Sequence, residues 1–184
     1  MIVDVAVPVL VILGLVLVNG AFVAAEFALV GARRSRLETL AEGGSRPARW
    51  LVGVFDRHAG KDGYIAVAQL GITLASIGLG MYGEPAVAGW LYGPFEDWGL
   101  SHAAAHTVGF IVALSGITYL HVVLGEMIPK ALALQAPEAV SLRVNPLMRT
   151  FGLLFRPMVA VLNAIAFGLM RLLRIPEPDP VSYT

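Results

Sequence analysis

Long apolar stretches alternate along this chain with connections of very different charge, and this alternation limits the possible folds more than any other feature. Three stretches are long enough to cross a hydrocarbon core about 30 Å thick, which takes roughly 20 helical residues. We place these predicted spans at about residues 5–32, 64–92 and 102–134. Because a backbone in lipid must satisfy its own hydrogen bonds, we expect an all-α membrane protein with three transmembrane helices.

The basic residues indicate how the spans are oriented. Of the 13 Lys and Arg residues, seven lie in the connection 33–63, none lies in the connection 93–101, and six follow residue 129. The positive-inside rule therefore predicts an amino terminus outside the cell and a cytoplasmic carboxyl terminus. Asp4 stands where a signal peptide would carry positive charge, so we expect the first span to be retained. The expected location is the cell inner (plasma) membrane, in contact with its lipids.

The region after the third span, residues 137–175, is apolar but repeatedly interrupted by Arg143, Pro146, Arg149, Arg156 and Pro157. Arginine is costly in a hydrocarbon core, which favours short helices lying in the cytoplasmic interface, as a belt. Proline removes a backbone donor, so we expect the two prolines to divide this belt into separate pieces. A tilted fourth span over residues 158–174 is the alternative. Residues 176–184 have the composition of an extended linker.

Each predicted span also carries polar residues at helical spacing. Asn19 and Glu26 share one face of the first span. The second and third spans carry similar stripes, made of Gln69, Thr73, Ser76 and Gly80, and of Ser115, Thr118, Gly125 and Glu126. Ionisable groups inside a span are costly and mark candidate functional sites, although small and hydroxyl residues also serve simple helix packing. We expect the three stripes to face one another.

The most specific of these positions is Glu126. It lies beside Gly125 and shortly before Pro129, which disfavours helical conformation in its predecessor. We predict that Pro129 breaks the third span and frees carbonyl groups next to the carboxylate, which would suit a hard cation. An ion pair between Glu126 and Lys130, one helical turn apart, is the structural alternative.

Other chemistry has less support. The chain has no cysteine, which excludes disulfides and thiolate metal sites. No hydrolase, phosphate-loop or zinc-protease motif is present, so we expect no enzyme and no nucleic-acid partner. His102 and His106 have the spacing of a helical metal site, but we interpret them as interfacial polar residues. We assign His121 no role.

Four segments together carry a family resemblance: NGAFVAAEFAL at 19–29, ARRSRL at 32–37, QLGITL at 69–74 and LGEMIPK at 124–130. Residues 1–175 thereby resemble the transmembrane domain of the CorC/CNNM (cyclin M) magnesium transporters. The resemblance implies a homodimer of three-span protomers with a belt of short helices. It also implies paired cytoplasmic CBS modules, expected to attach through the linker at 176–184.

The function implied by this resemblance is Mg2+ export. Whether this export is coupled to Na+ entry is left open by the resemblance. The family's motif residues fall on Gly125, Glu126 and Glu26. Many members have serine where this chain has Val23 and Ala25, and others have asparagine where it has Ile72. We therefore expect the metal ligands Glu126, Gly125, Ser76, Ala24 and Val23, with an ion path lined or supported by Glu26, Gln69, Thr73, Asn19, Pro129 and Lys130. The alternative is a non-transporting scaffold or sensor that anchors cytoplasmic regulatory modules.

Overall fold

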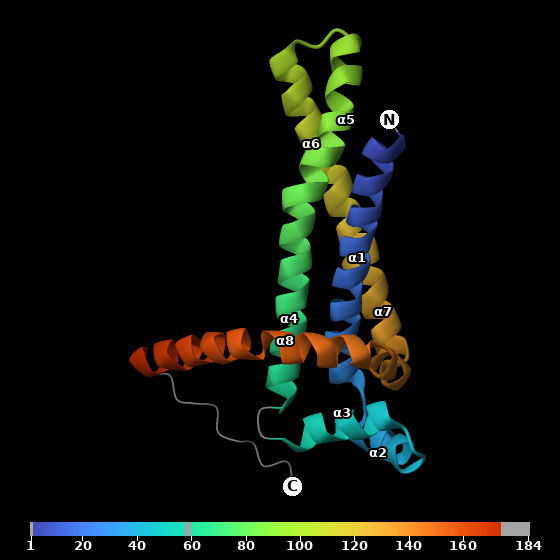
Figure 1. The fold of residues 1–184 in the computed structure, drawn as a ribbon, viewed down its shortest axis with the longest axis vertical. Coiled ribbons are helices and arrows are strands. Elements are labelled where there is room, and N and C mark those ends of the chain that lie inside the picture. The colour runs from blue at the N-terminus through green and yellow to red at the C-terminus, as the bar shows by residue number, and fades with distance from the viewer. Residues whose placement is uncertain (1, 58–59, 174–184) are drawn as a thin grey trace.

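The computed structural model describes residues 2–57 and 60–173, and in these ranges the chain forms helices and no strand (Figure 1). The helices, in chain order, are α1 (Ile2–Gly31), α2 (Arg34–Glu42), α3 (Arg46–Asp56), α4 (Gly60–Gly78), η1 (Leu79–Gly83), α5 (Glu84–Asp97), α6 (His102–Leu120), η2 (His121–Met127), α7 (Ile128–Gln135) and α8 (Pro137–Leu172). The two η elements are π-helical turns. The predicted all-α class is confirmed.

Three continuous helical segments are long and apolar enough to cross a membrane, at Asp4–Gly31, Gly60–Asp97 and His102–Gln135. They agree in number with the predicted spans, and the second extends beyond the predicted residues 64–92 at both ends. The second contains 38 residues, and at a rise of about 1.5 Å per residue it is roughly 57 Å long. It is therefore longer than a hydrocarbon core of about 30 Å, and Figure 1 shows α5 and α6 projecting as a hairpin past the amino-terminal end of α1.

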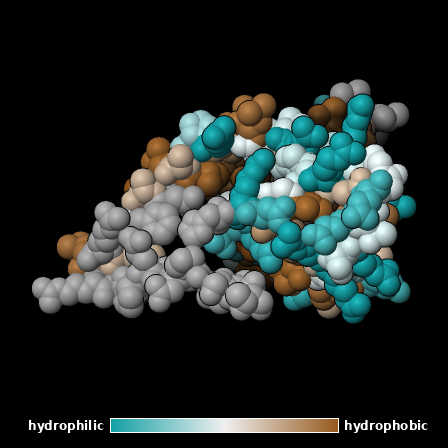
Figure 2. Space-filling view, turned by 90° about the horizontal axis from the view of Figure 1, so that it is seen from below, coloured by the Kyte–Doolittle hydropathy of each residue, from teal (hydrophilic) through white to brown (hydrophobic). Residues whose placement is uncertain are grey.

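The two ends of the molecule differ in structure. The basic end, as we call it, carries α2, α3 and α8, whereas the hairpin end carries the link between α5 and α6 (Figure 1). Figure 2 views the basic end directly and shows hydrophilic side chains over much of it. Between the ends, many large apolar side chains are exposed on the spans, including Leu10, Leu17, Val30, Met81 and Tyr119. Such a surface requires lipid or protein around it.

The connection 33–63 contains two helices that we did not predict. Helix α3 begins with Ser45, whose side chain accepts a hydrogen bond from the backbone N–H of Ala48. Its buried face is formed by Ala48, Leu51 and Val54. Helix α2 is tied to it by Arg34, which reaches Asp56 at 2.7 Å. Because charged residues are frequent in this connection, we did not recognise from the sequence that α3 has one apolar face.

Helix α8 corrects the prediction of short belt helices. It is continuous from Pro137 to Leu172, with Pro146 and Pro157 inside it. It packs against α1 and α4, where Met148 and Val159 are buried, and this burial offsets the cost of the two interior prolines. Figure 1 shows α8 lying across the ends of the spans, an arrangement that favours an interfacial belt over a fourth span. The predicted linker 176–184 lies outside the described residues.

The main core forms where α1, α3, α4 and α8 meet. Phe22 of α1 is fully buried there and contacts the ring of Phe151 edge-on, with centroids 4.6 Å apart. Helix α4 approaches Phe22 at Gly71, where an added Cβ would lie 2.5 Å from three atoms of the ring. This contact fixes the separation of the first two spans.

We expect Gly71→Ala to destabilise the protein by about 1–3 kcal/mol, the usual cost of overpacking a core. The buried ring cannot move away without displacing Phe151. Thermal unfolding of the purified protein in detergent measures the effect. Gly89→Ala is the matched control, since Gly89 lies on the same continuous segment and an added Cβ there meets nothing within 4 Å. Equal melting temperatures for the two variants would contradict the contact.

Candidate functional site

A buried amide joins all three spans in the middle of an apolar region. Asn19 of α1 has no exposed surface. Its Nδ2 donates a hydrogen bond to the backbone carbonyl of Gly125 in η2, at 2.9 Å. Its Oδ1 accepts one from Oγ of Ser76 in α4, at 3.3 Å. We use the name polar junction for Asn19, Ser76, His121, Gly125 and Glu126.

His121 extends this network toward Glu126. Its Nε2 lies 3.4 Å from Oγ of Ser76 and 4.0 Å from Oε1 of Glu126. The Ser76 hydroxyl has one proton, and because it donates that proton to Asn19, its oxygen is available to accept from His121. The His121 side chain is 15% exposed and that of Glu126 is 47% exposed. The junction therefore runs from a buried amide to a half-exposed carboxylate.

The sequence left open an ion pair between Glu126 and Lys130, and the structure does not form it. Lys130 Nζ instead lies 4.5 Å from the centroid of the Phe27 ring, in a cation–π contact. Within the described part of the chain, the basic group that Glu126 contacts is His121. The carboxylate is thus left without a neutralising lysine.

The third span is not broken at Pro129, contrary to our prediction. The π-helical turn η2 leads directly into α7, and Met127 and Ile128 keep helical φ and ψ angles. The consequence for Gly125 is nevertheless close to the one expected. In an α-helical register its carbonyl would accept from residue 129, which is a proline and has no N–H. Asn19 supplies a donor to this carbonyl.

Gly20 lets α1 come close to this region. A Cβ at Gly20 would lie 2.9 Å from Cγ of Pro129 and 3.4 Å from the carbonyl oxygen of Leu124. A residue with a side chain would push α1 away from the third span. The Asn19–Gly125 hydrogen bond, at 2.9 Å, depends on this close approach.

Closer to the basic end, a second polar contact joins α1 and α4. Gln69 Nε2 donates to Oε1 of Glu26 at 3.4 Å. The polar stripes of the first two spans therefore meet as predicted, at Glu26 and at Asn19. Thr73 bonds to the carbonyl of Gln69 within its own helix, at 2.8 Å, and is exposed.

The stripe predicted for the third span is only partly correct. Ser115 and Thr118 are exposed on the protomer, and Ser115 donates to Ile111 of its own helix. The π-helical turn that follows has more residues per turn than an α-helix, so an α-helical period cannot be extended from Ser115 to Glu126. Val23 and Ala24 are buried within α1, and their carbonyls as metal ligands stay a prediction.

His121 is the member of the junction that sequence reasoning missed. An imidazole within a span is costly to bury unless it has a partner, and His121 stands four residues before Gly125. These two facts could have identified it.

A cavity of about 510 Å3 lies elsewhere, at the basic end, with a lining that includes Trp50, Arg57, Tyr64, Arg149 and Arg156. It shares no residue with the polar junction. The candidate site therefore rests on the donor and acceptor geometry of the junction and not on the size of a hollow.

Known proteins match this chain over most of its length. Residues 10–184 match the family model described as the cyclin M transmembrane N-terminal domain. The UPF0053 protein YhdT of Bacillus subtilis (strain 168) is 43% identical over 152 residues, which cover 83% of this chain and 32% of that protein. The uncharacterized protein MT1889 of Mycobacterium tuberculosis (strain CDC 1551 / Oshkosh) is 40% identical over 178 residues, 96% of this chain and 49% of that protein. The chain thus spans about a third to a half of these curated relatives.

Proposed function

The chain belongs to the cyclin M (CorC/CNNM) transmembrane family, and from this premise we propose that it transports Mg2+ across the cell inner membrane, in the direction of export. The observation that supports this most directly is the polar junction, in which one buried amide bonds to both Ser76 and the Gly125 carbonyl. His121 lies between Ser76 and the carboxylate of Glu126 in the same junction.

The ligand chemistry of the junction suits a hard cation. Mg2+ binds oxygen and usually keeps several of its waters, because it dehydrates reluctantly. In this proposal Glu126 supplies the negative charge, while Ser76 Oγ and the Gly125 carbonyl supply neutral oxygens. Glu26 and Gln69 continue the path toward the basic end. His121 orients Ser76 and Glu126.

The orientation we propose places the basic end in the cytoplasm and the amino terminus outside. The support is the charge distribution, since all 13 Lys and Arg residues fall within residues 33–61 and 130–174 of the sequence and none lies in residues 64–129. Glu126 then lies in the half of the third span nearer the cytoplasm. We also propose that the chain works as a homodimer.

The test is direct binding and flux by this chain. We expect calorimetry on the purified protein to show saturable Mg2+ binding, weaker for Ca2+, whose larger radius fits a different cage. We also expect Mg2+ release from loaded liposomes that contain the protein, measured with a Mg2+-sensitive dye against protein-free liposomes. An inward Na+ gradient that accelerates release would establish Na+ coupling.

The competing function is a membrane scaffold or sensor that anchors soluble modules. It is favoured by the share of its relatives that the chain covers, which leaves more than half of YhdT and about half of MT1889 outside the match. A scaffold would fold normally yet bind no Mg2+ in the calorimeter. Absence of binding would therefore overturn the transport proposal.

A further inference from the structure

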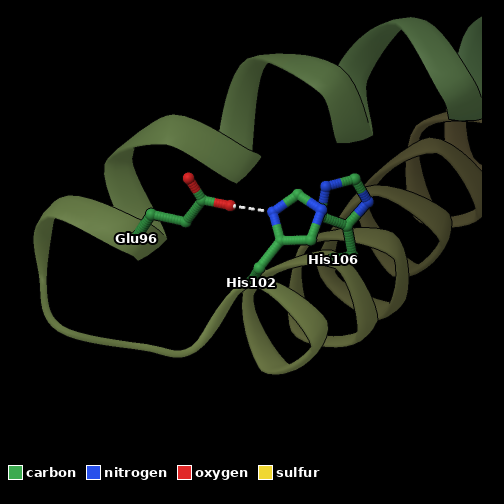
Figure 3. A group of neighbouring side chains, drawn as sticks. All are labelled: Glu96, His102 and His106. Atoms are coloured by element: carbon green, nitrogen blue, oxygen red, sulfur yellow. Dashed lines mark hydrogen bonds and ion pairs between the residues drawn. The ribbon is translucent and has the colours of Figure 1, made fainter.

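A second cluster of metal-binding side chains lies at the hairpin end, far from the polar junction. Glu96 comes from the last turn of α5, and His102 and His106 come from the first two turns of α6. One ligand atom of each residue lies within 4.8 Å of the others. Figure 3 shows the carboxylate of Glu96 and the two rings pointing toward one another across the hairpin.

The turn between the two helices produces this meeting. Gly99 has a φ of +93°, a left-handed conformation that glycine adopts without strain. Ser101 then caps α6 by accepting from the backbone N–H of Ala104, at 3.4 Å. His102 and His106 are four residues apart and lie on one face of α6. The end of α5 and the start of α6 therefore face each other at these three residues.

The side chains are also held in place. His102 Nδ1 lies 2.5 Å from Oε1 of Glu96. The ring of His106 stacks on Tyr92 of α5, with centroids 3.8 Å apart and an interplanar angle of 18°. Both imidazoles thus contact α5, each through a different residue.

Two imidazoles and one carboxylate form a ligand set that suits Zn2+, Cu2+ or Ni2+ better than Mg2+. Ligand bonds of about 2.0–2.2 Å around tetrahedral zinc place the ligand atoms roughly 3.3–3.5 Å apart. In the structure the ligand atoms of His102 and Glu96 are 2.5 Å apart and all three ligand atoms lie within 4.8 Å, so metal binding requires the exposed side chains of Glu96 and His102 to rotate. The fourth position would be taken by water, as in zinc sites with three protein ligands.

We propose that Glu96, His102 and His106 form a divalent transition-metal site, with Zn2+ as its probe, which cross-links α5 to α6 at the hairpin end. The simpler alternative is an exposed histidine–carboxylate contact with no metal, which would contribute little to stability. The proposal uses no residue of the polar junction, so it stands or falls apart from Mg2+ transport.

The test is a Zn2+ titration of tag-free protein by calorimetry, in buffer that contains enough Mg2+ to occupy the proposed Mg2+ site. We expect one Zn2+ per chain. We expect His102→Ala, His106→Ala and Glu96→Gln each to weaken binding at least tenfold, because even an outer-shell partner of a metal ligand contributes 10–100-fold. Asp97→Asn is the matched control, since it removes the neighbouring carboxylate of α5, and it should leave the affinity unchanged.

A second control separates the two candidate sites. His121→Ala should leave Zn2+ binding unchanged, because the polar junction is not the zinc site. The proposal is overturned if wild-type protein binds no Zn2+, if the hairpin variants bind it as wild type does, or if His121→Ala alone abolishes binding. Melting temperatures measured without zinc check that each variant is folded. We expect them to change little for the Glu96 and His102 variants, because both side chains are exposed.

Discussion

Replacing Glu126 with alanine is expected to reduce Mg2+ flux through liposomes to the protein-free background. Glu126 is the carboxylate of the polar junction, and no lysine neutralises it, because Lys130 lies on the ring of Phe27 instead. A cation entering an apolar region needs a compensating charge, since even one ion is costly there. Removing that charge leaves only neutral oxygens, so we expect Mg2+ binding to fall below detection in the calorimeter as well.

Two further variants make this result specific. Glu126→Gln keeps the shape and a carbonyl oxygen but removes the charge, and we expect it to lose flux almost as completely. Glu84→Ala removes a different carboxylate from the second span, outside the junction, and should retain most of the flux. Wild-type flux in Glu126→Ala, or equal losses in Glu84→Ala and Glu126→Ala, would remove Glu126 from the transport path.

The number of spans could be predicted because it depends on hydrophobic length, a property that lies entirely within each segment. The contacts of Asn19 with Ser76 and of Glu26 with Gln69 were predictable in outline for a similar reason. Both α1 and α4 are regular helices over these residues, so a period of 3.6 residues places their polar side chains correctly.

The predictions that failed were those in which a local sequence preference was overridden by packing between helices. Pro129 was expected to break the third span, but the helical segment continues through it from η2 into α7. Asn19 of α1 donates a hydrogen bond to the Gly125 carbonyl, which would accept from residue 129 in an α-helical register. Pro146 and Pro157 were expected to divide α8, but burial against the spans keeps it continuous. The sequence did not reveal that His121 belongs to the polar junction, because the π-helical turn changes which residues of the third span share a face.

Replacing Asn19 with alanine is expected to destabilise the protein and to reduce Mg2+ flux severely. The change removes the amide that bonds to both neighbouring spans, and it leaves the Gly125 carbonyl without its 2.9 Å donor. A buried group left unsatisfied costs about 1–3 kcal/mol, although interhelical bonds in membranes average only about 0.6 kcal/mol. We expect the upper part of this combined range, because Pro129 offers the carbonyl no N–H. Thermal unfolding in detergent measures the loss of stability, and dye-loaded liposomes measure the loss of flux.

The role of Pro129 makes this explanation testable by a double-mutant cycle. Pro129→Ala restores a backbone N–H at the position that an α-helical register pairs with the Gly125 carbonyl. If Asn19 acts mainly by replacing that missing donor, Asn19→Ala should cost less stability in the Pro129→Ala background than in the wild type, with a coupling of at least about 0.5 kcal/mol. Ser115→Ala is the control for loss of a polar group, because Ser115 bonds only within its own helix, to Ile111. Strict additivity of Asn19→Ala and Pro129→Ala would show that Asn19 stabilises the junction mainly through Ser76. In that case Ser76→Ala should reproduce most of the loss.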